Sequence, residues 1–151
     1  MIAALLSTFW WPFATLVPQP RPNSSVGPGE VIQAVVYALE NYNSPSPNAG
    51  IFTTYQFASP ANRANTGPYG NFLRLVKNPV FAPLLARHAT EFGPLAVQGD
   101  HAQQQLRLRT DDGRKARFYF VLSRQNSQQT QGRCAGCWMV DQVNIIQAGQ
   151  E

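Results

Sequence analysis

Two cysteines three positions apart, Cys134 and Cys137, precede an aromatic residue and an alternating run in CAGCWMVDQV. Such a pair can be half of a tetrahedral zinc site, a redox dithiol or a disulfide. Zinc would need two more ligands, and the two histidines, His88 and His101, fall in other predicted elements. A catalytic dithiol opens a helix, whereas this pair opens a predicted strand. The pattern favours a strand entrance where Cys137 packs as a small apolar residue, with a disulfide as the main alternative.

One carboxylate, Asp141, lies in the predicted last strand and could act as a general base in a pocket. Enolate chemistry would also need neutral donors, for which Tyr55 and Tyr119 are candidates, and His88 is a second candidate base. Each has an ordinary alternative, such as an ion pair between Asp141 and an arginine. The sequence contains no Gly-rich phosphate loop, serine nucleophile elbow or HExxH motif. We therefore favour a protein that is not an enzyme and expect no cofactor and no metal site.

A basic patch is the third candidate, because five of the twelve basic residues fall within eleven positions: Arg107, Arg109, Arg114, Lys115 and Arg117. Asp111 and Asp112 in the same window dilute its field. On a hairpin such a patch is usually a solvated face, although nucleic acid, anionic lipid and an acidic protein are alternative partners. Stacking on nucleic-acid bases would require exposed aromatic residues, and Phe118 and Phe120 belong to the predicted core. Nucleic acid is therefore not an expected partner.

Composition limits the function classes further. The chain has 151 residues, which corresponds to one domain with a tail, and its net charge is +4. Only 13% of the residues are charged, against about a quarter in a typical soluble domain. Asparagine and glutamine supply much of the polarity instead. We therefore do not expect a mechanism that depends on many charged side chains.

The elements that would position these residues follow an apolar tail, residues 1–17. Its uncharged part, Ile2 to Val17, would span roughly 24 Å as a helix, short of the ~30 Å hydrocarbon core. The tail lacks the basic start and cleavage site of a secretory signal. Four of its aromatic residues have the character of a membrane-interface anchor, or of a segment that packs into a protein groove: Phe9, Trp10, Trp11 and Phe13. We expect membrane association, with Arg21 weakly favouring the cytoplasmic side for the domain.

A Pro-rich linker, residues 18–27, leads to a single predicted domain at 28–147 and a short tail at 148–151. Three helices are predicted in the first half of the domain. The first starts at Pro28 and stops before SPSPN, because apolar residues recur at helical spacing. The second is capped by Ser59 and ends at Gly67, and the third covers Tyr69 to Lys77.

From about residue 90 the hydrophobic period changes to two, which predicts about four strands: Glu91 to Val97, Ala102 to Thr110, Lys115 to Arg124 and Cys137 to Gln147. The sequence DDGR is a tight turn between the second and third strands, so an antiparallel meander is expected. In the third strand Phe118 and Phe120 mark the core face, and Arg117 and Tyr119 mark a mixed face. Helices followed by such a meander predict an α+β fold with the helices on one face of a curved sheet.

The chain resembles an uncharacterised domain family from cyanobacteria, plant plastids and other bacteria, which is related to the nuclear transport factor 2-like superfamily. The resemblance lies in the segment FASPANRANTGPYGNFLRLV, the strand pair that follows it, and the last strand with CWMVDQV. The FASP segment and the pattern of Trp138 and Asp141 carry this resemblance, which covers about Pro28 to Gln147. It implies a cone of three helices in a concave antiparallel sheet, often with a pocket at the open end and often dimeric through the sheet. Superfamily members include enzymes, adaptors and assembly factors, so the fold does not choose a function.

Two function hypotheses result. The leading one is a non-catalytic adaptor or accessory subunit that docks on a membrane or membrane-protein complex through its tail, with the mixed sheet face contacting a protein partner or a second copy. The alternative is a small-molecule-binding protein, or an isomerase-like or dehydratase-like enzyme, that uses the cone pocket. In that alternative Asp141 and Tyr119 would contact the ligand.

Overall fold

A computed structural model describes residues 19–126, 128 and 134–146. The described chain forms four α-helices, one short 3-10 helix and five strands. In chain order these are α1 (Pro28–Glu40), α2 (Ala49–Phe57), α3 (Pro60–Thr66), α4 (Tyr69–Val76), η1 (Ala82–Leu84), β1 (His88–Phe92), β2 (Ala96–Gln98), β3 (His101–Thr110), β4 (Lys115–Arg124) and β5 (Trp138–Ile146). The helices come first and the strands last, as the change of hydrophobic period predicts.

The strands form one open antiparallel sheet in the order β1-β3-β4-β5, and β2 also pairs with β3. The prediction of a single strand over Glu91–Val97 is wrong: the structure has two short strands that lie along the same edge of β3. Pro94 lies between them, and proline cannot donate a backbone hydrogen bond to a neighbouring strand. The backbone N–H of Gly93 still donates to the carbonyl of Gln105 at 2.8 Å.

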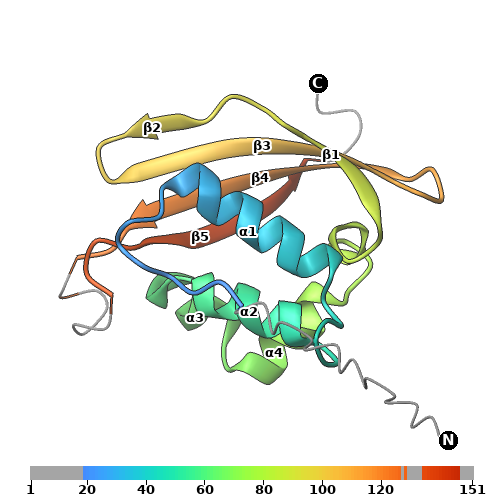
Figure 1. Cartoon of the computed structure of the whole chain (residues 1–151), viewed down its shortest axis with the longest axis horizontal. Coiled ribbons are helices and arrows are strands. Elements are labelled where there is room, and N and C mark those ends of the chain that lie inside the picture. The colour runs from blue at the N-terminus through green and yellow to red at the C-terminus, as the bar shows by residue number, and fades with distance from the viewer. Residues whose placement is uncertain (1–18, 127, 129–133, 147–151) are drawn as a thin grey trace, which may run out of the picture.

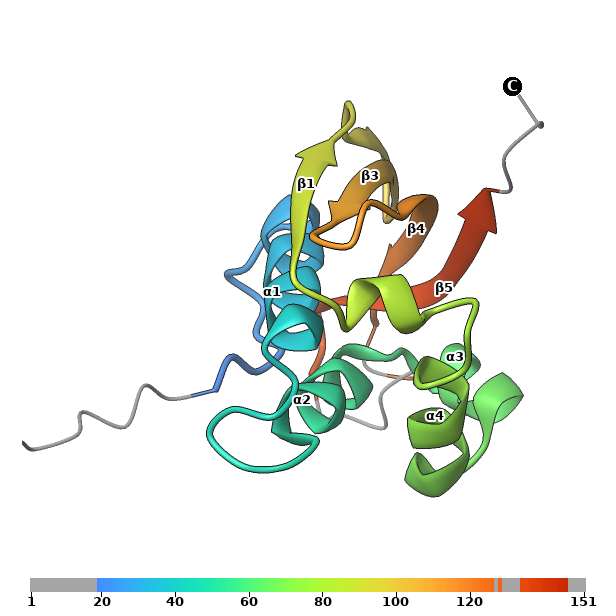
Figure 2. The ribbon, with the colours of Figure 1, turned by 90° about the vertical axis from the view of Figure 1, so that its right-hand side faces the viewer.

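All four α-helices lie on the same side of the sheet (Figure 1), and the view turned by 90° shows the same separation (Figure 2). The alternation predicted for β4 is confirmed, because Phe118, Phe120 and Leu122 are fully buried on the helix side. They pack with apolar residues of α1, including Ile32 and Val35, in one core cluster. The other face of the sheet carries no helix among the described residues.

The structure corrects the predicted helix number from three to four, because α2 was missed. Its residues include Ile51, Thr53 and Thr54, whose β-branched side chains have low helix propensity. No side chain caps its first turn. Tertiary contact fixes this helix instead: a Cβ at Gly50 would lie 1.8 Å from the carbonyl oxygen of Ala38, so α1 and α2 approach each other at a glycine.

The other helix signals are confirmed. Helix α1 begins at Pro28, the predicted first-turn proline. Ser59 caps α3, since its Oγ accepts a hydrogen bond from the backbone N–H of Asn62 at 3.1 Å. Gly67 ends α3 with φ of 83°, a conformation that favours glycine.

The predicted aromatic anchor at Phe9, Trp10, Trp11 and Phe13 lies outside the described residues. Within the described part of the chain, no helix has the length and apolar character needed to cross a membrane.

Candidate functional site

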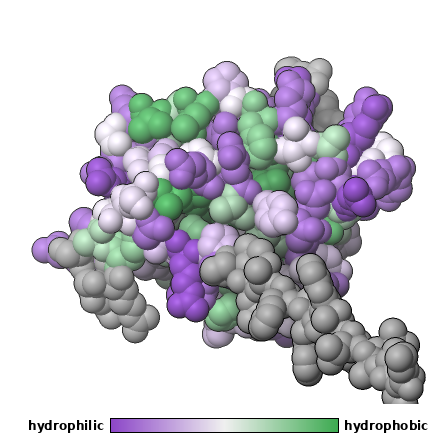
Figure 3. Space-filling model, in the orientation of Figure 1, coloured by the Kyte–Doolittle hydropathy of each residue, from purple (hydrophilic) through white to green (hydrophobic). Residues whose placement is uncertain are grey.

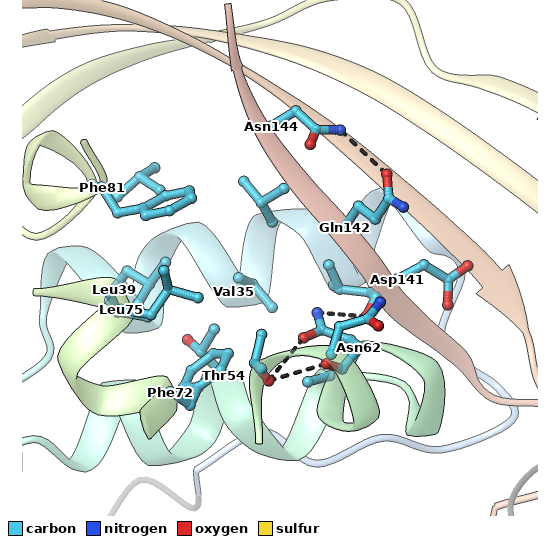
Figure 4. A pocket seen from close by; sticks show the side chains of 17 residues that line it. Val35, Leu39, Thr54, Asn62, Phe72, Leu75, Phe81, Asp141, Gln142 and Asn144 are labelled. Atoms are coloured by element: carbon cyan, nitrogen blue, oxygen red, sulfur yellow. Dashed lines mark hydrogen bonds between the residues drawn. The ribbon is translucent and has the colours of Figure 1, made fainter. Parts of the chain in front are cut away.

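A cavity of about 200 Å³ lies between the helices and β5 (Figure 4). We call it the helix-side cavity. Its walls come from α1, α2, α3, α4, the η1 segment and the edge strand β5. Apolar residues make up most of the lining, namely Val35, Leu39, Ala58, Phe72, Leu75, Val76, Phe81, Leu84, Val140 and Val143. An apolar cavity of this kind favours an apolar occupant.

One corner of the cavity is polar but uncharged. Asn62 is buried there, and its Nδ2 donates to the carbonyl oxygen of Val140 at 3.1 Å, which ties α3 to β5. The hydroxyl of Thr66 donates to the carbonyl oxygen of Asn62 at 3.0 Å. Further along β5, Asn144 Nδ2 donates to Gln142 Oε1 at 3.4 Å (Figure 4), but these two residues pair with Tyr119 and Val121 and so belong to the opposite face of the sheet. Amides and hydroxyls of this kind can orient a ligand by hydrogen bonds without adding charge.

Asp141 is the one titratable residue among those that line this cavity. Val140 pairs with Leu122 and Gln142 with Val121, so Asp141 is the additional residue of a β-bulge. Its carboxylate lies across the β5 ribbon from the apolar walls in Figure 4. A bulge redirects a side chain, and here it turns the predicted base away from the interior.

The other three candidate catalytic residues lie elsewhere. Tyr119 is half-buried on the sheet face opposite the helices, paired in register with Gln105 and Asn144. The ring of Tyr55 lies 4.4 Å from the guanidinium carbon of Arg63, and it packs against two other aromatic rings, with centroids 5.4 Å and 5.2 Å away. Neither Tyr119 nor Tyr55 lines the helix-side cavity with Asp141.

His88 opens β1 and is buried. Its Nδ1 lies 2.7 Å from the hydroxyl of Thr90, and its backbone N–H donates to Glu40 Oε1 at 3.3 Å. Nε2 has no hydrogen-bond partner among the described residues. These contacts tie the sheet edge to the end of α1, away from the helix-side cavity.

An aromatic cluster joins α2 and α4. Tyr69 packs against Phe52 and Tyr55, with both ring centroids 5.4 Å away. Burial raises the pKa of the Tyr69 phenol, because the charged form would lose hydration. This phenol therefore stays neutral and acts as a packing residue.

The structure joins Cys134 and Cys137 in a disulfide with Cα atoms 5.6 Å apart. Cys137 is also fully buried, and β5 starts at the next residue, so the pair does stand at a strand entrance. Gly136, with φ of 82°, makes the turn between them. In the described part of the chain, no group of three or more His, Cys, Asp and Glu residues could hold a metal ion.

A second hollow, of about 850 Å³, lies on the sheet face that the helices leave uncovered. We call it the basic hollow, because its lining includes four residues of the predicted basic patch: Arg107, Arg109, Lys115 and Arg117. Glu91 of β1 is the carboxylate in the lining. Figure 3 shows hydrophilic side chains gathered at the end of the molecule that carries the β3–β4 turn.

Arg114, the fifth residue of the patch, is held in the β3–β4 turn instead. Its Nε lies 3.0 Å from Oδ2 of Asp112, and Thr110 also hydrogen-bonds the Asp112 carboxylate. The hydrogen bonds from Thr110 and then Arg114 lower the pKa of Asp112. The turn thus separates Arg114 from the four cations of the basic hollow.

Sequence reasoning missed most of the helix-side cavity. Of the candidate residues, only Asp141 lines it. Leu39 and Phe72 were expected only to pack in the core, and Phe81 was assigned no role. These three residues lie in different elements of the chain, so the periodicity of a single helix or strand does not relate them. The amide of Asn62 gave the one available signal, since asparagine and glutamine carry most of the polarity of this chain.

Comparison with known proteins places the chain in a family. The family model described as "Domain of unknown function (DUF4864)" matches residues 30–150. Searches of curated proteins and of solved structures found no match to the chain. The matched region contains every strand and nearly all of the helical residues, including both hollows. The chain therefore belongs to the DUF4864 family, an uncharacterised domain family.

Proposed function

We propose that this protein is a non-catalytic binding module, an adaptor or accessory subunit, whose helix-side cavity accepts an apolar group of a protein partner. The observation that carries this proposal is the chemistry of the cavity lining. It combines apolar walls with the neutral polar side chains of Asn62 and Thr66, and its single titratable residue, Asp141, points away. Acid–base catalysis needs a titratable group within hydrogen-bond reach of the substrate, whereas binding needs only apolar surface and orienting donors.

The size of the cavity supports a side chain over a larger ligand. Pockets for drug-sized ligands usually measure about 300–1,000 Å³, and this cavity measures about 200 Å³. A cavity of roughly 150 Å³ lined by apolar residues holds one benzene ring. One aromatic or two small aliphatic side chains of a partner would therefore fill it.

The position of the cavity beside β5 supports an extended partner segment. Val140 bridges to Ala58 and its carbonyl oxygen accepts from the backbone N–H of Ser59 at 2.9 Å. Beyond this point, β5 has no strand neighbour on that side among the described residues. A partner strand could pair with this edge and insert alternate side chains into the cavity, as in β-strand addition.

We further propose that the apolar tail holds this module on a membrane or on a membrane-protein complex, with the domain on the cytoplasmic side. Support comes from the uncharged run Ile2 to Val17 and its aromatic residues: Phe9, Trp10, Trp11 and Phe13. Aromatic rings of this kind favour the membrane interface. Polar replacement of these four residues should release the full-length protein from the membrane fraction, and unchanged fractionation would disprove the anchor.

We also propose that this domain is a relative of the nuclear transport factor 2-like superfamily. Helices on one face of an antiparallel sheet, and a cavity between helices and sheet, support the relation. An experimental structure that shows a closed cone around the helix-side cavity would test it.

Two leucines of nearly equal exposure provide the test of the binding module. Leu75 lines the cavity and is 37% exposed, whereas Leu95 precedes β2, away from the cavity, and is 39% exposed. In full-length tagged protein purified from its native cells, Leu75→Glu should release a stoichiometric partner and Leu95→Glu should retain it. Both variants keep their charge at the surface, so both should fold. Retention of the partner by Leu75→Glu would exclude the cavity as its docking site.

The apolar cavity with its polar corner also favours a second candidate, a small-molecule-binding protein. In that case native mass spectrometry of the full-length protein should detect a bound small molecule instead of a protein partner. If the ligand also reacts, as in an isomerase-like or dehydratase-like enzyme, Asp141→Asn should abolish its turnover. Conversion that persists in this variant would exclude Asp141 as the base.

A further inference from the structure

The register of the sheet groups the cations of the basic hollow more tightly than the sequence indicates. Arg107 of β3 lies directly opposite Arg117 of β4, and Arg109 lies opposite Lys115. Glu91 of β1 continues the first of these two rows. Side chains directly opposite on one face of an antiparallel pair have Cβ atoms about 4.5–5.5 Å apart, and diagonal neighbours are about 7–8 Å apart. The four cations therefore occupy two adjacent cross-strand pairs of the β3–β4 ladder.

Like charges directly opposite each other destabilise a sheet. Glu91 is the one carboxylate in the lining and stands beside Arg107 in its row, whereas the row of Arg109 and Lys115 contains no carboxylate. Arg107, Arg109 and Lys115 form no ion pair with another described residue. The two ion pairs of this region, Arg87–Asp111 at 3.9 Å and Arg114–Asp112 at 3.0 Å, lie at the turn. The fold thus gathers positive charge in a hollow and keeps the nearby aspartates outside it.

We propose that the basic hollow is a binding site for a compact, multiply charged anion with phosphate chemistry, carried by a small molecule. Three of its four cations are arginines, whose planar guanidinium groups donate two parallel hydrogen bonds to one phosphate. Two rows separated by about 7 Å can hold one phosphate or two linked phosphates. An anion between the rows would reduce the repulsion between Arg109 and Lys115, whose row contains no carboxylate.

The rest of this face favours a small ligand over a polymer. Next to Arg117, Tyr119 pairs with Gln105 and Asn144, and further residues of the face along β3 and β5 include Gln103 and Gln142. These side chains are neutral, so the positive charge is confined to one end of the sheet. A nucleic-acid strand would require cations along several phosphates and several stacking rings. The amides beside the cluster can instead hydrogen-bond an uncharged part of a small organic phosphate.

Calorimetric titration of the full-length protein with inorganic pyrophosphate at low ionic strength tests this site. We expect saturable binding that weakens as chloride rises. The double variant Arg107→Gln/Arg117→Gln should weaken it at least about tenfold, because each charged hydrogen bond contributes more than a neutral one. The matched control, Arg74→Gln/Lys77→Gln on α4 and its C-cap, removes the same charge elsewhere and should change affinity less than about twofold.

Three outcomes would overturn the proposal: no binding at millimolar pyrophosphate, equal weakening in both double variants, or binding only to polymers or lipid surfaces. For the last, single-stranded oligonucleotides of increasing length and vesicles with or without anionic phospholipid are tested beside pyrophosphate. Affinity that grows with oligonucleotide length, or vesicle binding without pyrophosphate binding, would assign the cluster to nucleic acid or membrane instead. Thermal unfolding of each variant verifies that it remains folded. The test does not depend on the helix-side cavity, so the two proposals fail separately.

Discussion

The helix-side cavity and the basic hollow lie on opposite faces of the same sheet, and the chain builds them differently. The cavity needs side chains from five helical segments and β5, which meet only when the core packs. The hollow needs only three neighbouring strands, β1, β3 and β4, and Ile146 at the end of β5. Loss of one cavity wall should therefore weaken the whole fold, whereas loss of a charge in the hollow should change recognition and leave the fold intact. This difference can be measured.

The largest expected effect is on the cavity wall. Phe72 is buried between α4 and the core, so Phe72→Ala should lower the free energy of unfolding by about 3–5 kcal/mol, through lost burial and an enlarged cavity. Arg109→Gln in the basic hollow should change it by no more than about 0.5 kcal/mol. Urea unfolding of both variants checks the pair. Similar losses in the two variants would contradict the separation of a structural face from a recognition face.

A smaller effect is expected in the polar corner of the cavity. Asn62→Ala removes the hydrogen bond to the carbonyl of Val140, which keeps a second donor in the backbone N–H of Ser59. The expected loss is about 1 kcal/mol in the free energy of unfolding. Asn65→Ala is the matched control, because Asn65 lines the same cavity but is exposed. Equal stability of the two variants would show that the link between α3 and β5 contributes nothing.

The basic hollow predicts a change of the opposite sign. Lys115→Gln removes one of two opposed cations, in the row that contains no carboxylate, and should raise the free energy of unfolding by about 0.2–0.5 kcal/mol at low ionic strength. The gain should disappear as salt screens the repulsion. Arg114→Gln should instead leave stability equal or lower, since Arg114 pairs with Asp112. Denaturation at two salt concentrations distinguishes these signs, and a salt-independent gain would argue against a repulsive cluster.

The smallest effect concerns pH at the turn that ends the hollow. Hydrogen bonds from Thr110 and Arg114 lower the pKa of Asp112 below its ordinary value. A lowered folded pKa means that this stabilisation is present above the unfolded pKa and is lost as the pH falls through the folded pKa. Asp112→Asn should therefore flatten the acid side of the stability curve slightly. Carbon-detected NMR titration of the carboxylates checks the shift directly.

Local rules predicted much of the fold but little of the cavity. Pro28, the Ser59 cap and the alternation of Phe118 and Phe120 each depend on neighbouring residues, and each was confirmed. Helix α2 was missed because its position depends on the contact of Gly50 with α1. The break of the edge strand at Pro94 was also missed, since a strand pattern continued on both sides of it.

The sequence by itself determined the order of elements, the core face of β4 and the concentration of cations around the β3–β4 turn. These properties follow from interactions over a few residues, which composition and spacing record directly. Only the tertiary structure decided that Asp141 stands on a bulge, that distant apolar residues line one cavity, and that Arg107 faces Arg117 on an uncovered sheet face. Packing and strand register set these distances, because they join residues far apart in the chain that no local pattern relates.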